Sequence, residues 1–286
     1  MGVFVDLRRE YYERLCRDIL GHRSGTEIYN IADGSNAASV ALAQGMADAI
    51  GFPPAAPAPQ SGQTAGSLFT LATRDFLEAA FDRLSHIRPG SWLYVTNPSE
   101  AAIAVFDQFD HLAELRQFLI AHRELETAIG SDYLVTPDIV IGRNPMEDDE
   151  INVAEALIEP ADSVARLTPL RSANERRPIL HASISCKWTM RSDRAQNTRT
   201  EALNLIRNRK GRTPHIAAVT LEPLPSRLAS IAMGTGDVDC TYHAALDELV
   251  IAAADSDFPD AYDLLQTLVD GRRLRDISDL PLDLAS

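Results

Sequence analysis

RPILHASISCKW, residues 177–188, alternates between apolar and polar side chains. This period of two is that of a β-strand, whose successive side chains point to opposite faces of the sheet. The apolar positions are Leu180, Ala182, Ile184, Cys186 and Trp188, and the polar positions are His181, Ser183, Ser185 and Lys187. The pattern predicts a strand that brings Lys187 to its end, directly before the charged stretch RSDR at 191–194.

The segments on either side of this strand alternate between helical and strand-like patterns. Gly51 ends one expected helix, and a Pro/Gly-rich loop covers 51–66. We expect the acidic C-terminal tail to be loose. Helices are expected at 5–20, 36–50, 67–85, 111–129, 151–158, 198–209 and 259–275, and further strands at 91–96, 132–142 and 215–223. This alternation predicts an α/β fold.

Length and composition are those of a globular chain with its own core. The 286 residues include 45% hydrophobic and 24% charged residues, and we expect a single domain over 1–286. No apolar run is long enough for a membrane helix, and no signal-peptide pattern begins the chain. Three widely spaced cysteines fit a reducing cytoplasm better than a disulfide framework. The sequence therefore predicts a cytoplasmic location and no membrane partner.

The charge of the chain is unevenly distributed. The net charge is −14, yet residues 166–212 hold 12 basic and 3 acidic side chains, whereas residues 101–150 hold 3 basic and 11 acidic ones. Binding depends on the potential near the ligand, and not on the charge of the whole chain. The basic stretch is therefore compatible with a nucleic-acid partner, although charges also cluster on surfaces by chance.

Lys187 stands out because lysine is rare in this chain. The 27 basic residues include only two lysines, Lys187 and Lys210. Where any cation serves, the chain uses arginine. A lysine at the end of the predicted strand therefore favours a role for a compact amine, which approaches a phosphate as a point charge.

Several common active-site patterns are missing from the sequence. The seven histidines never fall within five residues of one another, so no local zinc-type pair exists. Walker, GxGxxG and GxSxG patterns are also absent, and MGTGD at 233–237 is interpreted as a turn. A DNA methyltransferase is excluded, because there is neither a glycine-rich cofactor loop nor an NPPY-type motif.

Acidic side chains and Lys187 form a candidate catalytic set. Asp138 lies in one strand-like run, Ser185 and Lys187 lie on the polar face of another, and Glu201 begins the helix after it. Two carboxylates beside a lysine suit Mg²⁺-dependent phosphodiester hydrolysis. Each residue also has a structural interpretation: Pro137-Asp138 as a strand break, Thr198-x-x-Glu201 as a capping box, and Ser185 and Lys187 as ordinary polar strand positions.

The joint spacing is more specific than any one of these residues. The spacing resembles the signature of restriction endonucleases that cut sites with a CCGG core. The residues that carry this resemblance are Pro137-Asp138, Ser185-x-Lys187 and Glu201, together with RSDR at 191–194. These enzymes belong to the PD-(D/E)XK nuclease superfamily. The resemblance implies a mixed central β-sheet flanked by helices, with the catalytic and recognition segment at about 132–212.

The resemblance also assigns roles, with departures from the plain superfamily pattern. Ser185 replaces the acid expected two residues before the lysine, and Glu201 takes the position that supplies the missing carboxylate in this group. The resemblance implies Asp138, Glu201 and the main-chain carbonyl of Cys186 as metal ligands. Some relatives use a further glutamate from an earlier helix. Glu78 is the candidate for this position, and its role stays open.

RSDR has a physical interpretation as a reader of G·C pairs. Arg191 and Arg194 can each donate two hydrogen bonds to guanine O6 and N7, and Asp193 can accept from cytosine N4. The resemblance extends the CCGG core to GCCGGC, cut to leave four-base 5′ overhangs. Contacts to the outer pair or the minor groove are expected from Arg227, Asp33 and Gln63.

The assembly and two alternative functions remain open at this stage. A palindromic site implies a two-fold homo-oligomer on double-stranded DNA, and the resemblance implies a dimer of dimers. A partner methylase would protect the host. The alternatives are a non-catalytic sequence-specific DNA-binding regulator, which predicts binding without cleavage, and a structure-specific nuclease of the same superfamily, which RSDR disfavours.

Overall fold

A computed structural model of the chain describes residues 2–56, 58, 61–96, 103–129, 135–159, 163–190, 192–234 and 236–286. For residues 129 and 192–194 it describes the backbone alone. Arg191 of the RSDR motif therefore lies outside the described residues, and the side chains of Asp193 and Arg194 lie outside them as well.

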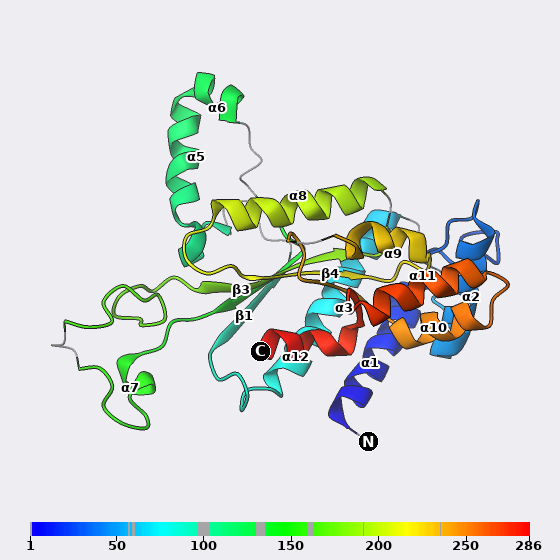
Figure 1. The fold of residues 1–286 in the computed structure, drawn as a ribbon, viewed down its shortest axis with the longest axis horizontal. Helices are drawn as coiled ribbons and strands as arrows, with labels where there is room; N and C mark the ends of the chain where they lie inside the picture. The colour runs from blue at the N-terminus through cyan, green and yellow to red at the C-terminus, as the bar shows by residue number, and fades with distance from the viewer. Residues whose placement is uncertain are drawn as a thin grey trace. The chain divides into compact units, whose positions relative to one another are not determined.

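Helices and strands alternate along the chain, and the structure has two strands after residue 223 that the sequence did not indicate (Figure 1). The strands are β1 Trp92–Thr96, β2 Ile139–Arg143, β3 Ile179–Lys187, β4 His215–Thr220, β5 Cys240–His243 and β6 Leu274–Asp276. The α-helices are α1 Val3–Asp18, α2 Ala37–Ile50, α3 Gly62–Asp82, α5 His111–Ala121, α6 Arg123–Ile129, α7 Asp148–Ile151, α8 Ser192–Asn208, α9 Pro225–Ala232, α10 Leu246–Ala254, α11 Pro259–Asp270 and α12 Leu280–Ala285. The described residues also form the 3₁₀-helices η1 Asp107–Phe109 and η2 Ile277–Asp279.

The described strands form one mixed sheet in the order β1-β2-β3-β4-β5-β6. β1 and β2 are antiparallel, whereas β4 pairs in parallel with β5, and β5 in parallel with β6. The sheet and its flanking helices confirm the predicted α/β fold with a mixed central β-sheet. β3, the strand predicted from the alternation at 177–188, lies between β2 and β4 in this order.

β3 is buried on both of its faces. Leu180 and Ile184 are fully buried, as the apolar half of the pattern predicts, but His181 and Ser185 are also only 4% and 7% exposed. A strand in the interior of a sheet covered by helices is shielded on both sides. The polar face is therefore an internal polar layer, in which the His181 ring lies 4.8 Å from the Trp92 ring.

The antiparallel pair at β1 and β2 depends on a close approach at one glycine. Gly142 is paired with Leu93. A Cβ atom added at Gly142 would lie 2.8 Å from the Phe106 ring and 3.0 Å from the Leu93 side chain. Only glycine therefore fits this position of β2 without displacing its neighbours.

The chain divides into two compact units, each assembled from segments distant in sequence. The first unit contains Met1–Ile87, Ile184–Thr200 and Ile216–Ser286, and the second contains Arg88–Ser183 and Glu201–His215. The division falls inside β3, inside α8 and after the first residue of β4. The single domain expected over 1–286 stays a prediction.

The core of the first unit is built by pairs of closely packed helices. α1 packs on α3, and α2 packs on α10 (Figure 1). Gly45 of α2 faces Ala252 of α10, and a Cβ atom at Gly45 would lie 2.9 Å from the Ala252 Cβ atom. Asn36 caps α2 by accepting a hydrogen bond from the Ser39 N–H, and Gly51 ends it at φ 77°. The expected bounds of this helix are confirmed.

Two helix starts differ from the prediction in ways that affect the site. α8 begins at Ser192, six residues before the expected start at Thr198. Thr198 therefore lies inside the helix, 2% exposed, and the capping-box interpretation of Thr198 and Glu201 is wrong. α3 begins at Gly62, because Ser61 accepts a hydrogen bond from the Thr64 N–H. Gln63 thus lies in the first turn of a helix, and not in the preceding loop.

Two helices of the second unit are shorter than expected. The helix predicted at 111–129 is interrupted at His122, whose φ of −130° and ψ of 71° are not helical. The His122 Nδ1 atom lies 2.9 Å from the Phe118 carbonyl oxygen and ends α5 by donating to it. The helix expected at 151–158 is wrong: α7 ends at Ile151, and the Asn152 side chain then accepts hydrogen bonds from two backbone N–H groups of the following loop.

The C-terminal tail is packed, contrary to the expectation of a loose segment. α12 buries Leu280 and Leu284, each 1% exposed, against α3 and η2. The spacing of four residues places these two leucines on one side of the helix. The acidic residues of the tail obscured this apolar stripe, which is short and begins beside Pro281.

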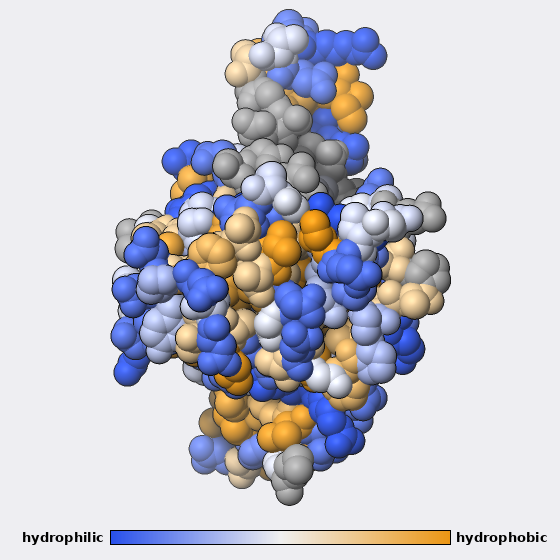
Figure 2. Space-filling view, turned by 90° about the vertical axis from the view of Figure 1, so that its right-hand side faces the viewer, coloured by the Kyte–Doolittle hydropathy of each residue, from blue (hydrophilic) through white to orange (hydrophobic). Residues whose placement is uncertain are grey.

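No helix in the described part of the chain is long and apolar enough to cross a membrane. On the face shown in Figure 2, small hydrophobic areas lie between hydrophilic side chains.

Candidate active site and DNA-binding cavity

Lys187 is the last residue of the buried strand β3. Cys186 before it and Trp188 after it are 5% and 4% exposed, whereas Lys187 is partly exposed. The Trp188 ring meets the Phe69 ring of α3 edge-on at a centroid distance of 5.4 Å. Because both neighbours are anchored in the core, the direction of the Lys187 side chain is restricted by its backbone.

A buried hydrogen bond joins this strand to α8. The Ser185 Oγ atom lies 3.2 Å from the Thr198 Oγ1 atom. Ala195, Thr198, Ala202 and Leu205 form the buried stripe of the helix. Glu201 follows Thr198 by three residues, so it lies on a neighbouring part of the same helix face, and it is partly exposed. α8 thus carries both the end of RSDR and the candidate carboxylate.

Asp138 directly precedes β2. Pro137 and Ile139 on either side of it are buried, and Asp138 itself is partly exposed. Asp138 and Glu201 belong to the second unit, whereas Ser185, Cys186 and Lys187 belong to the first. The convergence of these residues on one metal ion is not a property of either unit alone, and it stays a prediction.

The available donor atoms fit a hard cation. Asp138 and Glu201 offer carboxylate oxygens, and the Cys186 main chain offers a carbonyl oxygen, which are the ligands that Mg²⁺ prefers. Within the described ranges, no group of three or more His, Cys, Asp or Glu side chains forms a candidate metal site. A site with two carboxylates and one carbonyl needs no such group, and it leaves positions for water and a phosphate.

Two of the expected DNA contacts pair with each other. Arg227, in the first turn of α9, donates a hydrogen bond to Asp33. The hydrogen bonds from Ser35 and Arg227 lower the pKa of the Asp33 carboxyl to about 2. The ion pair fixes both side chains, each between a quarter and a third exposed. Gln63 is exposed at the start of α3.

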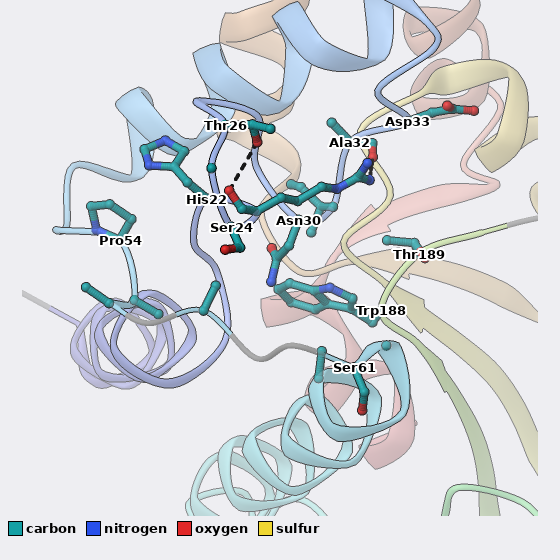
Figure 3. A pocket seen from close by; sticks show the side chains of 18 of the residues that line it. His22, Ser24, Thr26, Asn30, Ala32, Asp33, Pro54, Ser61, Trp188 and Thr189 are labelled. Atoms are coloured by element: carbon teal, nitrogen blue, oxygen red, sulfur yellow. Dashed lines mark hydrogen bonds between the residues drawn. The ribbon is translucent and has the colours of Figure 1, made fainter.

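A cavity of about 1030 Å³ in the first unit gathers these residues (Figure 3). Asp33 and Arg227 line it, as does Gly62, which neighbours Gln63. Trp188 and Thr189, three and two residues before Arg191, form part of its wall. The cavity therefore lies beside the chain that leads into RSDR, and it brings together segments that are more than 150 residues apart in sequence.

The loop at 22–34 supplies cavity residues that the sequence did not indicate. Arg23 donates a hydrogen bond to the carbonyl oxygen of Ala32, and Figure 3 labels Ala32 among the residues that line the cavity. The Thr26 hydroxyl donates to the Arg23 carbonyl oxygen at 3.1 Å. The loop carries no motif, and its position on the cavity follows only from the fold.

The basic stretch is less available than its composition suggests. Within it, Arg171, Arg177, Arg199 and Lys210 form ion pairs with acidic residues outside the stretch. Arg199, for example, lies 2.8 Å from Asp237. These pairs remove part of the local positive potential. The positive charge that the stretch presents is therefore smaller than its count of basic residues implies.

Glu78 of α3 lies on the surface of the first unit. It is 44% exposed and forms an ion pair with Arg74, four residues earlier, at 3.7 Å. This (i, i+4) pair is an ordinary helix-surface arrangement. The ion pair with Arg74 gives no indication that Glu78 contacts the candidate site.

Comparison with known proteins assigns the chain to a family. The family model described as NgoMIV restriction enzyme matches residues 11–286. The chain is 46% identical over 285 residues to a type II restriction enzyme, NgoMIV, of Neisseria gonorrhoeae, which covers 99% of both chains. The resemblance to restriction endonucleases is thereby confirmed. The chain, whose strand β3 ends at Lys187, belongs to the NgoMIV restriction enzyme family.

Proposed function

We propose that this site-specific endonuclease hydrolyses double-stranded DNA with Mg²⁺ at GCCGGC and leaves four-base 5′ overhangs. Membership of the restriction enzyme family over residues 11–286 carries the assignment as a DNA endonuclease. The position of Lys187 at the end of a buried strand, tied to α8 through Ser185 and Thr198, supports the active site.

The proposed chemistry assigns one task to each group. Mg²⁺, when bound, polarises a phosphoryl oxygen and lowers the pKa of a bound water. Asp138, Glu201 and the Cys186 carbonyl hold the cation. Lys187 orients the attacking water and offsets the negative charge that develops on the phosphate. Ser185 is a neutral member of this set, and its hydroxyl lies 3.2 Å from the Thr198 hydroxyl.

Sequence reading is assigned to RSDR and to the cavity residues. Arg191 and Arg194 bind guanines, and Asp193 binds a cytosine. Asp33 and Arg227 contact the outer base pair, and Gln63 reaches the minor groove. The position of Asp33 and Arg227 on the cavity supports this assignment, because the cavity also borders the residues that lead into RSDR.

Arg191→Ala should weaken binding to the cognate site more than binding to unrelated DNA. A bidentate arginine–guanine pair provides about 1–3 kcal/mol of discrimination, so the affinity ratio should fall about 5- to 150-fold. Fluorescence anisotropy in EDTA with both duplexes measures this ratio. An equal loss of affinity on both duplexes would identify Arg191 as a phosphate contact instead.

The assembly follows from the symmetry of the target. A palindrome read in two halves requires a two-fold dimer, and we propose a dimer of dimers that acts on two sites together. Sedimentation with and without cognate DNA tests the tetramer, and plasmids with one or two sites test the joint action. We place the enzyme in the cytoplasm, with a partner methylase that protects the host DNA.

Plasmid digestion tests the proposed function as a whole. The protein is incubated with plasmid DNA and either Mg²⁺ or EDTA, and the fragment ends are sequenced. Discrete fragments that end within GCCGGC, formed only with Mg²⁺, are expected. Specific binding without cleavage would favour the DNA-binding regulator, and cuts set by DNA structure would favour a structure-specific nuclease.

A further inference from the structure

Glu222 is a buried acid that the proposed mechanism does not use. It follows β4 by two residues and is 0% exposed, and among the described residues no other glutamate is buried to this degree. Burial raises the pKa of its carboxyl to about 7. A buried carboxylate is unfavourable unless hydrogen bonds and charges compensate it, so the contacts of Glu222 indicate what stabilises it.

The Glu222 carboxylate joins two segments that carry proposed DNA readers. Its Oε2 atom accepts a hydrogen bond from the Met190 N–H at 2.7 Å, and its Oε1 atom accepts one from the Leu224 N–H at 3.1 Å. Met190 directly precedes Arg191, and Leu224 directly precedes α9, which carries Arg227. The Arg227 Nη1 atom also lies 3.8 Å from the Glu222 Oε1 atom.

The backbone of Glu222 is itself held in place. Its N–H donates to the Thr220 Oγ1 atom at 3.1 Å. Its carbonyl oxygen lies 3.1 Å from the His243 Nε2 atom, while the Ala245 N–H donates to the His243 Nδ1 atom at 3.1 Å. Because Nδ1 accepts, Nε2 carries the proton and donates to Glu222. Burial lowers the pKa of His243 to about 4, which keeps this tautomer neutral.

We propose that Glu222 is a positioning residue for sequence reading: its two carboxylate oxygens set the backbone at Met190 and at Leu224, and thereby the relative placement of RSDR and Arg227. The proposal rests on the recognition roles given to these arginines above. Holding the two segments in advance reduces the ordering cost of binding. This positioning matters most for the cognate site, because only that site is contacted by RSDR and Arg227 at the same time.

Glutamine at position 222 would keep the volume of the side chain but not its hydrogen bonds. A carboxylate accepts at both oxygens, whereas an amide offers one oxygen and one NH₂ group, which would face either the Met190 or the Leu224 N–H. A buried N–H without an acceptor is unfavourable. Glu222→Gln should therefore release one of the two segments while leaving Asp138, Lys187 and Glu201 unchanged.

The pH dependence of stability gives an independent measurement. Because burial raises the folded-state pKa of Glu222 from 4.5 to about 7, its contribution to stability is present below about pH 4.5 and is lost as the pH rises through about 7. The charged and titratable groups that face it are Arg227 on α9, Asp33 in the loop before α2, and His243 at the end of β5. The lowered pKa of His243 gives the opposite slope between about 4 and 6.5. The difference between native protein and Glu222→Gln should isolate the Glu222 slope, as measured by denaturant unfolding from pH 5 to 8.5.

The deciding experiment compares kcat/KM on a cognate duplex and on duplexes with one base pair changed. The cognate site is the one found by plasmid digestion. Glu222→Gln should lower the ratio of the two kcat/KM values by about tenfold or more. In the native protein this ratio should rise with pH through about 7, as the carboxyl ionises. Using a ratio removes pH effects on the chemical step that are common to both duplexes.

Glu248→Gln is the matched control. Glu248 of α10 is 13% exposed and accepts hydrogen bonds from Arg8 at 2.9 Å and Tyr12 at 2.7 Å, away from the cavity lining. Its variant should lose stability but keep the ratio within about twofold. An unchanged ratio in Glu222→Gln, with a reduced ratio in Arg191→Ala and Arg227→Ala, would overturn the positioning role alone. An unchanged ratio in all three variants would overturn the proposed recognition as well. If Glu222→Gln does not fold, a native ratio that stays flat with pH overturns the positioning role.

Discussion

Replacing Lys187 with alanine should leave specific DNA binding intact and reduce the rate of cleavage by about 10²- to 10⁴-fold, the range expected for the loss of a catalytic acid–base or charge-stabilising group. The side chain projects from the end of β3, between the buried residues Cys186 and Trp188. Its removal leaves the packing of both neighbours unchanged, so the loss should appear in the chemical step. Single-turnover cleavage with saturating enzyme separates this step from binding.

Two variants make the result specific. Lys210→Ala removes the only other lysine of the chain, which pairs with Asp110 on the surface of the second unit, and it should cleave within about threefold of the native rate, because exposed ion pairs contribute little. Lys187→Arg tests whether a compact amine is required. Cleavage by Lys187→Ala at a rate near that of the native enzyme would refute the catalytic role of Lys187.

Replacing Asp138 with alanine should abolish Mg²⁺-dependent cleavage at every metal concentration that leaves the protein soluble. Losing even an outer partner of a metal ligand costs about 10- to 100-fold in affinity, so losing a carboxylate that binds the cation directly should cost more. Titrating Mg²⁺ or Mn²⁺ against cleavage rate and against calorimetric binding checks both effects.

Asp149→Ala is the appropriate control for this change. Asp149 is an exposed acid of α7 in the same unit, and its loss changes the net charge equally without touching β2. The metal titration of this variant should match that of the native protein. If Asp138→Ala showed the same titration curve as the native protein, Asp138 would not be a metal ligand.

The sequence predicted those features that depend on local patterns. The alternation at 177–188 predicted β3, and Gly51 predicted the end of α2, because a strand period and a helix C-cap are both local features of the sequence. The spacing of Asp138, Lys187 and Glu201 indicated the family before the fold was known. In each of these cases the signal lies within a few residues or in a fixed separation.

Features that depend on tertiary contacts could not be predicted. Thr198 has the sequence pattern of a helix cap, yet its hydroxyl bonds to Ser185 across the fold, and α8 extends six residues further towards the N-terminus. The burial of Glu222 and its bonds to Met190 and Leu224 depend on segments more than 30 residues apart or on a turn after β4. The LEP sequence at 221–223 gives no sign of this role.

Electrostatic availability is another property that the sequence concealed. Counting residues 166–212 identified a basic stretch, but ion pairs with Asp110, Asp148 and Asp237 engage several of its cations. A count treats every charge as free, whereas the fold decides which charges are paired. The same applies to Arg227 and Asp33, which the sequence indicated separately and which the structure joins.

Metal-directed backbone cleavage tests most directly whether three distant segments hold one cation. Fe²⁺ binds oxygen ligands of the kind proposed for Mg²⁺, and with ascorbate and peroxide it generates radicals that cut the peptide chain close to the bound metal. The protein is treated in the presence of cognate DNA, and the fragments are mapped by mass spectrometry. We predict cuts near Asp138, near Cys186 and near Glu201 in the same sample, all suppressed by excess Mg²⁺ and all lost in Asp138→Ala. Cuts at only one of these three places, or cuts that Mg²⁺ does not suppress, would contradict a shared metal site.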